Sequence, residues 1–194
     1  MKHTITRTLA LSILLAATGT SCSINVQHAP LKSPAVARSG SVTTAPSASG
    51  IDGRVGWGTF TCFFIPIVPV HVEGDGNAAV MAAVRDSLKK AGYDVRSGSP
   101  GPGGGKALTC KVESMSYFNY TYFFPLVPTW GGAEIKVALL SGDREVWTRE
   151  FSGRGITLNF TNGYTIANRQ AMTKVCNQMV DAFASDEFHA ALTH

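Results

Sequence analysis

The feature that most constrains the fold is the order in which segments with a helical spacing of apolar residues and segments with a strand-like spacing follow each other along residues 51–194. Apolar residues recur with a helical period in two stretches, about 77–91 and 165–183. The remaining segments alternate apolar with polar residues, or are rich in β-branched and aromatic residues, as strands are. The order β-α-β-β-β-β-α predicts an α+β fold, with a mainly antiparallel sheet of about four to five strands and two helices packed on one face.

Local sequence marks the ends of both helices. Asp75 or Asn77 can cap the first helix, and Gly92 stands where a left-handed C-terminal glycine is common. The apolar face of the second helix carries Ala171, Val175, Met179 and Phe183. After that helix we expect a frayed tail, which contains His189 and His194.

The strand predictions cover most of the intervening chain. Residues 144–152 form a hairpin with 135–139, because Ser141-Gly142-Asp143 is a typical turn between two alternating segments. Further strands are expected at 55–72, interrupted by Pro66 and Pro69, and at 93–95, 107–122 and 156–160.

The N-terminus has the pattern of an export signal. Lys2 and Arg7 precede an apolar run at 9–17, whose nine helical residues would span about 13 Å of a hydrocarbon core that is about 30 Å thick. The run is therefore too short to cross a membrane and is typical of a secretory signal peptide over 1–21. Residue Cys22 follows four small residues, 18–21.

This arrangement resembles the lipobox of bacterial lipoproteins, in which the cysteine after the small residues is lipidated and becomes the mature N-terminus. The resemblance covers the first 22 residues and implies acyl chains, palmitate among them, on Cys22. It departs from the usual box at Gly19, where Leu, Val or Ile is usual, so ordinary secretory cleavage is the alternative. In this family an Asp after the cysteine often marks retention in the inner membrane. Ser23 therefore favours the outer membrane, with the protein facing the periplasm.

Residues 22–50 are predicted to be the lipidated cysteine and a flexible linker, and residues 51–194 the globular domain. The linker is rich in Ala, Ser, Pro and Thr and buries too little apolar surface to order its backbone. As a flexible coil its 28 residues would reach about 30 Å. The expected role is a tether between the membrane and the domain, and ordering on a partner is the alternative.

The distribution of charge excludes one class of partner. The chain has 17 Lys and Arg, of which Lys2, Arg7, Lys32 and Arg38 precede residue 51, so 13 remain against 13 Asp and Glu. A domain with no net charge lacks the basic surface that neutralises phosphates, and we expect no nucleic-acid binding.

One motif occurs twice. Residues 63–69 and 122–128 both run aromatic, aromatic, apolar, Pro, aliphatic, Val, Pro. Proline cannot donate to a sheet ladder, so each copy is expected at a strand end, an edge or a loop. Either their aromatic residues close the core, or they form an exposed patch for a lipid, a membrane surface or a partner protein. The candidate interaction residues are Phe63, Phe64, Phe123, Phe124 and Trp130.

Several catalytic and metal-binding patterns are incomplete. Gly105-Lys106 lacks the earlier glycine and the following Ser or Thr of a phosphate-binding loop. His71, Glu73 and Asp75 alternate along a strand end, but the chain offers few further ligands to close a metal site, and a solvated turn is favoured. No Gly-x-Ser-x-Gly motif occurs. The sequence thus favours a protein without catalytic residues, metal or cofactor, and a hydrolase site built from distant residues is the alternative.

With Cys22 lipidated, Cys62, Cys110 and Cys176 remain in an oxidising compartment. One disulfide with one buried thiol, or three buried thiols, are both compatible with their positions. The absence of Cys-x-x-Cys disfavours a redox role.

A second, architectural resemblance links this layout to small envelope lipoproteins that assist transport or assembly machines. It rests on the anchored N-terminus, the linker, and the stretch 142–147 followed by a long last helix. It implies a lipid-anchored, non-enzymatic accessory module that binds an envelope protein. A carrier of lipid or another small apolar ligand is the alternative.

Overall fold

The computed structural model describes residues 22–59, 66–98, 105–119, 127–159 and 162–194. These residues form one mixed sheet and three helices. The strands are β1 (Cys22–Ile24), β2 (Ser41–Thr44), β3 (Arg54–Thr59), β4 (Pro66–Val72), β5 (Asp94–Ser97), β6 (Lys106–Asn119), β7 (Thr129–Ser141) and β8 (Arg144–Thr157). The helices are α2 (Gly76–Ala91), α3 (Gly163–Phe183) and α4 (Asp186–Thr193).

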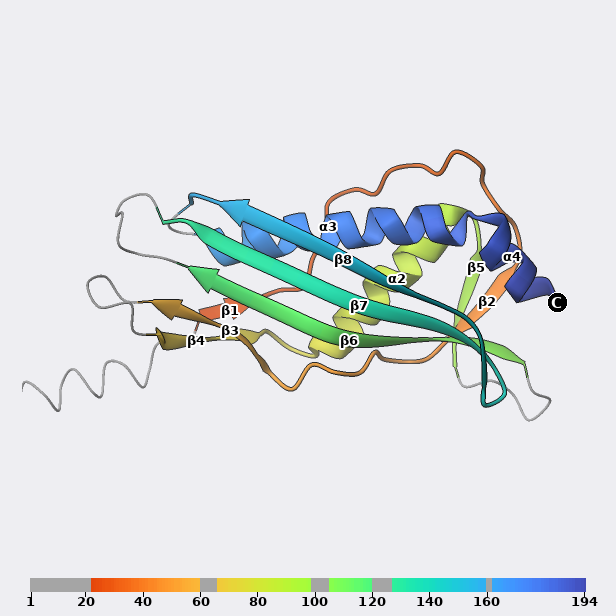
Figure 1. Cartoon of the computed structure of the whole chain (residues 1–194), viewed down its shortest axis with the longest axis horizontal. Coiled ribbons are helices and arrows are strands. Elements are labelled where there is room, and N and C mark those ends of the chain that lie inside the picture. The colour runs from red at the N-terminus through yellow and green to blue at the C-terminus, as the bar shows by residue number, and fades with distance from the viewer. Residues whose placement is uncertain (1–21, 60–65, 99–104, 120–126, 160–161) are drawn as a thin grey trace, which may run out of the picture.

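The long strands β6, β7 and β8 form an antiparallel meander, and β8, which pairs with β7 alone among the described strands, lies at an edge of the sheet (Figure 1). The β7–β8 hairpin turns at Gly142, whose φ of +60° suits a residue without a side chain. The other edge of β6 is shared by two strands that lie parallel to it. Strand β3 pairs with the C-terminal end of β6, and β2 pairs with its start.

The expected fold class is right in its general form, since helices and sheet are present as an α+β arrangement. The sheet, however, has eight strands, and it is mixed rather than mainly antiparallel. Strand β4 pairs antiparallel with β3, whereas β1 lies parallel to β4 and β5 parallel to β2. The added strands β1 and β2 both come from the segment predicted to be a linker.

Residues 22–50 are therefore not a free tether, because backbone and side-chain hydrogen bonds hold them against the domain. Besides forming β1 and β2, the segment crosses α3, where the Ala29 amide donates to Thr173 Oγ1 at 2.8 Å and the Lys32 amide donates to Asn177 Oδ1 at 2.9 Å. The composition could not reveal this, since the bonds are made by the backbone of the segment to distant residues.

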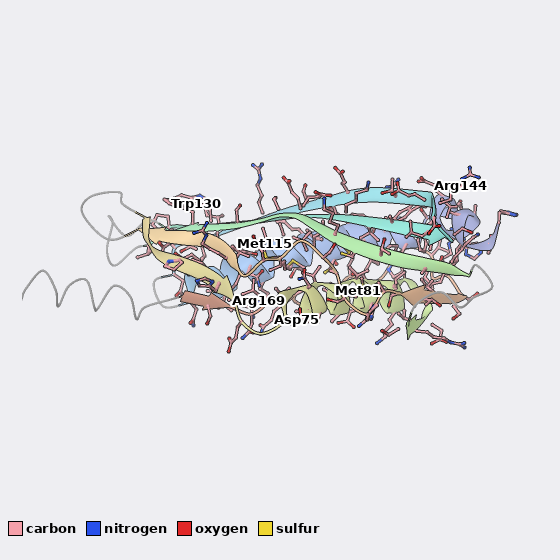
Figure 2. The ribbon with its side chains drawn as sticks, turned by 90° about the horizontal axis from the view of Figure 1, so that it is seen from below. Asp75, Met81, Met115, Trp130, Arg144 and Arg169 are labelled. Carbon is pink, nitrogen blue, oxygen red and sulfur yellow. The ribbon has the colours of Figure 1, made fainter. Side chains whose placement is uncertain are left out.

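Helices α2 and α3 pack on the same face of the sheet and against each other, and the core lies between them and the strands (Figures 1 and 2). Helix α2 begins at the predicted cap, where the Asp75 carboxylate accepts a hydrogen bond from the Ala78 amide. It ends at Gly92, which has a φ of +106°. Both helix predictions are confirmed to within two residues.

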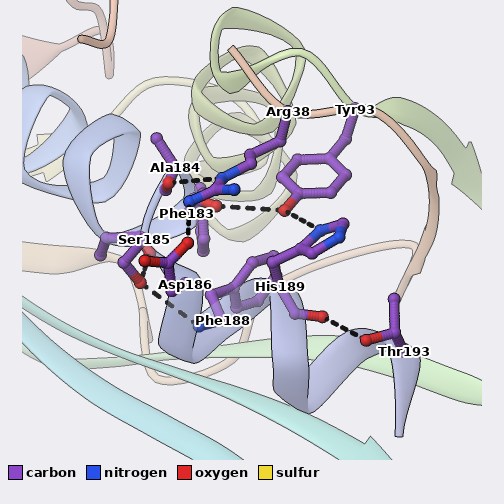
Figure 3. Close-up of polar contacts among 10 residues, drawn as sticks. Arg38, Tyr93, Phe183, Ala184, Ser185, Asp186, Phe188, His189 and Thr193 are labelled. Atoms are coloured by element: carbon purple, nitrogen blue, oxygen red, sulfur yellow. Dashed lines mark hydrogen bonds and ion pairs between the residues drawn. The ribbon is translucent and has the colours of Figure 1, made fainter. Parts of the chain in front are cut away.

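The residues after α3 are not a frayed tail but a third helix, α4, and Figure 3 shows its contacts. Ser185 caps this helix by accepting a hydrogen bond from the Phe188 amide at 3.3 Å. Phe188 is fully buried against the rings of Trp147 and Phe183. An ion pair from Arg38 to Asp186 ties the N-terminal segment to the same helix.

Two of the three remaining cysteines lie in the described residues, and both are buried free thiols: Cys110 on β6 and Cys176 on α3. Cys62 lies outside the described residues. Within the described part of the chain, none of the helices combines the length and the apolar character that crossing a membrane requires.

Candidate functional site

The outer face of the sheet, away from the helices, carries a row of exposed apolar residues near one end. Phe118, Trp130 and Ile156 are direct cross-strand neighbours on β6, β7 and β8. Their exposed fractions are 40%, 41% and 57%, and the ring centroids of Phe118 and Trp130 lie 6.1 Å apart. Large apolar side chains gathered at one exposed place are typical of a binding surface. We call these three residues the apolar row.

Glycines on the inner face explain how α3 comes close to the sheet beneath the row. A Cβ on Gly131 would lie 2.3 Å from the Tyr117 ring. A Cβ on Gly155 would lie 2.1 Å from the Ala167 carbonyl oxygen of α3. Tyr117 therefore lies against Gly131 on the inner face, where its hydroxyl reaches Asn168 of α3, and the residues on either side of these inward positions point outward.

The next outward row, two residues farther from the sheet end, contains Ser116, Gly132 and Arg154. Arg154 is exposed, and among the described residues its guanidinium has neither a hydrogen bond nor an ion pair. Its own carbonyl accepts a hydrogen bond from Lys174 Nζ at 2.8 Å, which holds this part of β8 against α3. An Arg side chain in this state is available for a ligand anion.

The third outward row contains Ser114, Glu134 and Ser152. The Ser114 hydroxyl donates to Glu134 Oε2 at 3.1 Å. Together with Phe118 and Trp130 of the apolar row and with the Arg154 row, this third row lines an open groove of about 400 Å³, floored in the middle by Gly132. The groove is therefore apolar at the end of the sheet, cationic in the middle and anionic beyond.

Of the five predicted interaction residues, Trp130 belongs to this site. Phe63, Phe64, Phe123 and Phe124 lie outside the described residues. The residues that flank their segments lie at the same end of the sheet as the apolar row. Thr59 and Pro66, on either side of residues 60–65, pair with each other, and Asn119 pairs with Thr129 on either side of residues 120–126.

The sequence prediction missed Phe118 and Ile156, which complete the row with Trp130. Ile156 alternates with Leu158, which is also 57% exposed, but such alternation usually indicates a core-facing side, so the exposure of Ile156 follows only from the pairing of β8 with β7. Phe118 could not be found either, because β6 contains a register shift between Val112 and Ser114 that exchanges its inward and outward positions.

Cys22, the predicted lipidation site, is the first residue of β1. The pairings run from Cys22 to Val70, from Val70 to Gly56, and from Gly56 to Tyr117. Cys22 thus shares a register line with Tyr117, the residue before Phe118. With strands about 4.8 Å apart, it lies three strand spacings, about 14 Å, from β6.

The other candidate groups are accounted for by structural contacts. Glu73 Oε2 accepts a hydrogen bond from Asn25, and Asp75 caps α2. In the described part of the chain, no three His, Cys, Asp or Glu side chains are grouped as metal ligands would be. Lys106 donates to the Ala191 and Leu192 carbonyls at 2.8 and 3.1 Å, at the C-terminal end of α4.

Comparison with known proteins gives a likeness of fold. No protein-family model matches the sequence, and no curated protein matches it. The PelC dodecamer from Paraburkholderia phytofirmans has 13% identity, a TM-score of 0.40, and coverage of 79% of this chain and 92% of that one. Lipoprotein GNA1162 from Neisseria meningitidis has 14% identity, a TM-score of 0.36, and coverage of 61% and 85%.

A stronger likeness is to the crystal structure of protein XCC0632 from Xanthomonas campestris, described as family model DUF330. The identity is 17% and the TM-score 0.58, with 90% of this chain and 100% of that chain covered. At this identity the likeness is one of fold alone, and this chain has the same overall fold as that protein.

Proposed function

We propose that this protein is a lipid-anchored lipoprotein of the bacterial cell envelope and acts as a non-enzymatic binding module at the membrane surface. The N-terminal signal, the small residues before Cys22 and Ser23 after it support an acylated protein of the outer membrane that faces the periplasm. The binding surface in this proposal is the apolar row.

The observation that carries the proposal is the register between Cys22 and the row. Since β1 starts at Cys22 and lies within the sheet, acyl chains on this residue would be joined to the domain without a tether. A triply acylated residue binds a membrane stably, because each buried CH₂ contributes about 0.8 kcal/mol. The anchor would therefore hold the apolar row at the membrane surface.

The anchor is tested by replacing Cys22 with Ala in the full chain expressed in a bacterial host. The wild-type protein should incorporate a clickable palmitate analogue and remain in the membrane fraction after a high-salt wash. The Cys22→Ala protein should lose the label and keep the unprocessed signal segment. A variant that is processed normally and keeps its salt-resistant membrane association would overturn the proposed anchor.

The binding surface is tested by photo-crosslinking in cells with benzoylphenylalanine at Trp130. Val146 provides the matched control, since it is 37% exposed and lies at the other end of β8. A discrete adduct at Trp130 and background at Val146 would support the apolar row as the binding surface. Background at both positions would overturn that assignment, whatever the outcome for Cys22.

A further inference from the structure

We infer that the groove beside the apolar row binds the headgroup of a phospholipid that carries an ethanolamine amine. This inference rests on the proposed function and names the ligand of the same site. The lipid would belong to the membrane that holds the Cys22 acyl chains.

The order of side chains along the groove matches the order of groups along such a lipid. From the sheet end inward, the outward rows are apolar at Trp130, cationic at Arg154 and anionic at Glu134. A phospholipid with an ethanolamine headgroup presents acyl chains, then a phosphate, then an ammonium. Successive rows are two residues apart, or about 6.6 Å along a strand. Phosphate and ammonium are separated by an ethylene bridge, so both can be met by neighbouring rows.

Arg154 is suited to the phosphate. Its planar guanidinium can donate two parallel hydrogen bonds to phosphate oxygens, and none of the described residues occupies these donors. The strand around it is held in place, because Lys174 and Gln178 of α3 bond to the Arg154 and Ser152 carbonyls.

Glu134 is suited to the ammonium. Its carboxylate accepts one hydrogen bond from Ser114, which leaves other lone pairs for a ligand. Glu113 and Glu150 line an adjoining hollow together with Glu134. Glu113 is paired with Lys111 Nζ at 2.9 Å, so the carboxylates of Glu134 and Glu150 supply the negative charge that disfavours the reversed orientation, in which the phosphate would lie beside them.

Arg154 and Glu134 are close but do not neutralise each other. Arg154 pairs with Gly132 and Glu134 with Ser152, so the two are diagonal neighbours on adjacent strands, whose separation is about 7–8 Å. No ion pair joins them. The two charges thus remain available to a ligand that carries both signs.

Packing does not require a glycine at position 132, and the effect of Gly132 is to keep the groove open. A Cβ at this position would lie 3.7 Å from the Gly153 carbonyl and 3.8 Å from Ser116 Oγ, which are ordinary contacts. By contrast, Gly131, Gly153 and Gly155 on the inner face leave no room for a Cβ. Packing therefore requires glycine on the inner face, whereas at Gly132 the missing side chain makes space between Arg154 and Ser116.

The experiment uses the acylated full-length protein, purified from membranes in a neutral detergent and stripped of bound lipid. It is mixed with equal amounts of palmitoyl-oleoyl phosphatidylethanolamine, phosphatidylcholine and phosphatidylglycerol, and the retained lipids are identified by native mass spectrometry. Phosphatidylethanolamine should be retained most. Phosphatidylcholine has a quaternary ammonium without N–H donors, and phosphatidylglycerol has no cation, so both should be retained less.

Variants separate the two charges. Arg154→Gln should reduce retention of all three lipids about tenfold, since a charge-assisted hydrogen bond is lost. Glu134→Gln should keep retention but remove the preference for phosphatidylethanolamine over phosphatidylglycerol. Gly132→Val should fill the groove and weaken binding of all three. Arg144→Gln removes an equivalent charge at the far end of the sheet and should change nothing (Figure 2).

Equal retention of the three lipids, or retention unaffected by Arg154→Gln, would overturn the inference. If Trp130 still forms a discrete crosslink in cells in that case, the proposed function stands and only the ligand is wrong. If Trp130 forms no crosslink and Cys22→Ala has no effect, the proposed function itself fails.

Discussion

The Tyr117 hydroxyl donates a hydrogen bond to Asn168 Oδ1 at 2.6 Å, and both side chains are buried between the sheet and α3. The side-chain amide of Asn168 in turn donates through Nδ2 to the Asn25 backbone carbonyl at 2.5 Å. This buried polar chain links β6, α3 and the segment that follows β1. It therefore joins the N-terminal segment to the strand that carries Phe118.

Replacing Tyr117 with Phe should destabilise the protein by about 1–3 kcal/mol, because Asn168 Oδ1 would remain buried without a donor. Urea unfolding followed by circular dichroism measures the change. Ser116→Ala is the control, since Ser116 is exposed on the opposite face, and it should change stability by less than about 0.5 kcal/mol. Equal stabilities of the two variants would show that the hydrogen bond contributes nothing.

The two faces of the sheet should respond differently to an added methyl group. Gly155→Ala places a Cβ against the Ala167 carbonyl and should destabilise the fold by about 1–3 kcal/mol, as overpacking does. Gly132→Ala meets only ordinary contacts and should leave stability nearly unchanged. Thermal unfolding of both variants tests this. A Gly132→Ala protein as unstable as Gly155→Ala would contradict the assignment of the faces.

The free edge of β8 is covered by three side chains of α3. Gln170 accepts from the Ile156 amide at 2.9 Å, Lys174 donates to the Arg154 carbonyl, and Gln178 bonds to both backbone groups of Ser152. The periods match, because four helical residues rise about 6.0 Å and two strand residues about 6.6 Å.

Removing this cover should make the edge available for pairing between molecules. The double variant Gln170→Ala and Gln178→Ala is expected to lose about 1–3 kcal/mol of stability and to self-associate with rising concentration. Sedimentation velocity measures the association. Arg169→Ala, on the exposed side of α3, serves as the control. A double variant with the sedimentation behaviour of that control would rule out a protective role for the glutamines.

Helix α4 should contribute strongly to stability despite its terminal position. Phe188→Ala would remove a ring packed 4.9 Å, between centroids, from both Trp147 and Phe183, and should cost about 3–5 kcal/mol. His194→Ala, at the exposed end of the chain, should have little effect. Urea unfolding compares the two, and similar midpoints would show that α4 does not belong to the cooperative core.

Two buried thiols should make the protein less stable at high pH. Burial, with a smaller contribution from the nearby Cys176 thiol, raises the pKa of Cys110 from 9.0 to about 12. Burial likewise raises the pKa of Cys176 to about 12. In the unfolded chain these thiols ionise near pH 9, so their contribution to stability is complete below pH 9. It is lost between pH 9 and 12, by about 1.4 kcal/mol per pH unit and thiol.

Urea unfolding under reducing conditions at pH 8 and pH 10 tests this dependence. The wild-type protein should lose more stability between these two values than Cys110→Ala does, by about 1.4 kcal/mol. Between pH 6 and pH 8 the two proteins should change in parallel. Parallel behaviour up to pH 10 would mean that Cys110 is accessible to hydroxide or water in the folded state.

Both long helices and the β7–β8 hairpin could be predicted from the sequence because their determinants are local. In α2, the apolar face, the Asp75 cap and Gly92 lie within a stretch of 18 residues, and the structure agrees to within one residue at each end. The hairpin follows from alternation on both sides of Gly142. Such features depend on contacts between near neighbours in the chain.

The strands β1 and β2 were decided by tertiary structure alone. Their residues have the composition of a flexible linker, and they are ordered by backbone hydrogen bonds to β4, β5 and β6. The partner of a parallel strand lies far away in the sequence, so the residues of the strand itself do not indicate the pairing. The same holds for α4, which is held in the core by Phe188 and by contacts with Tyr93 and Arg38.

By itself, the sequence determined the general class of fold and two of the helices, and it predicts that the chain is exported. Which residues make up the candidate site was decided by the register in which β6, β7 and β8 pair. Leu108, Cys110 and Val112 point inward at even positions, whereas beyond the irregularity in β6 the inward residues are Met115 and Tyr117. This shift turns Phe118 outward beside Trp130. A strand's alternation repeats every two residues, so a single extra residue exchanges its faces, and only the pairing with β7 shows where that residue lies.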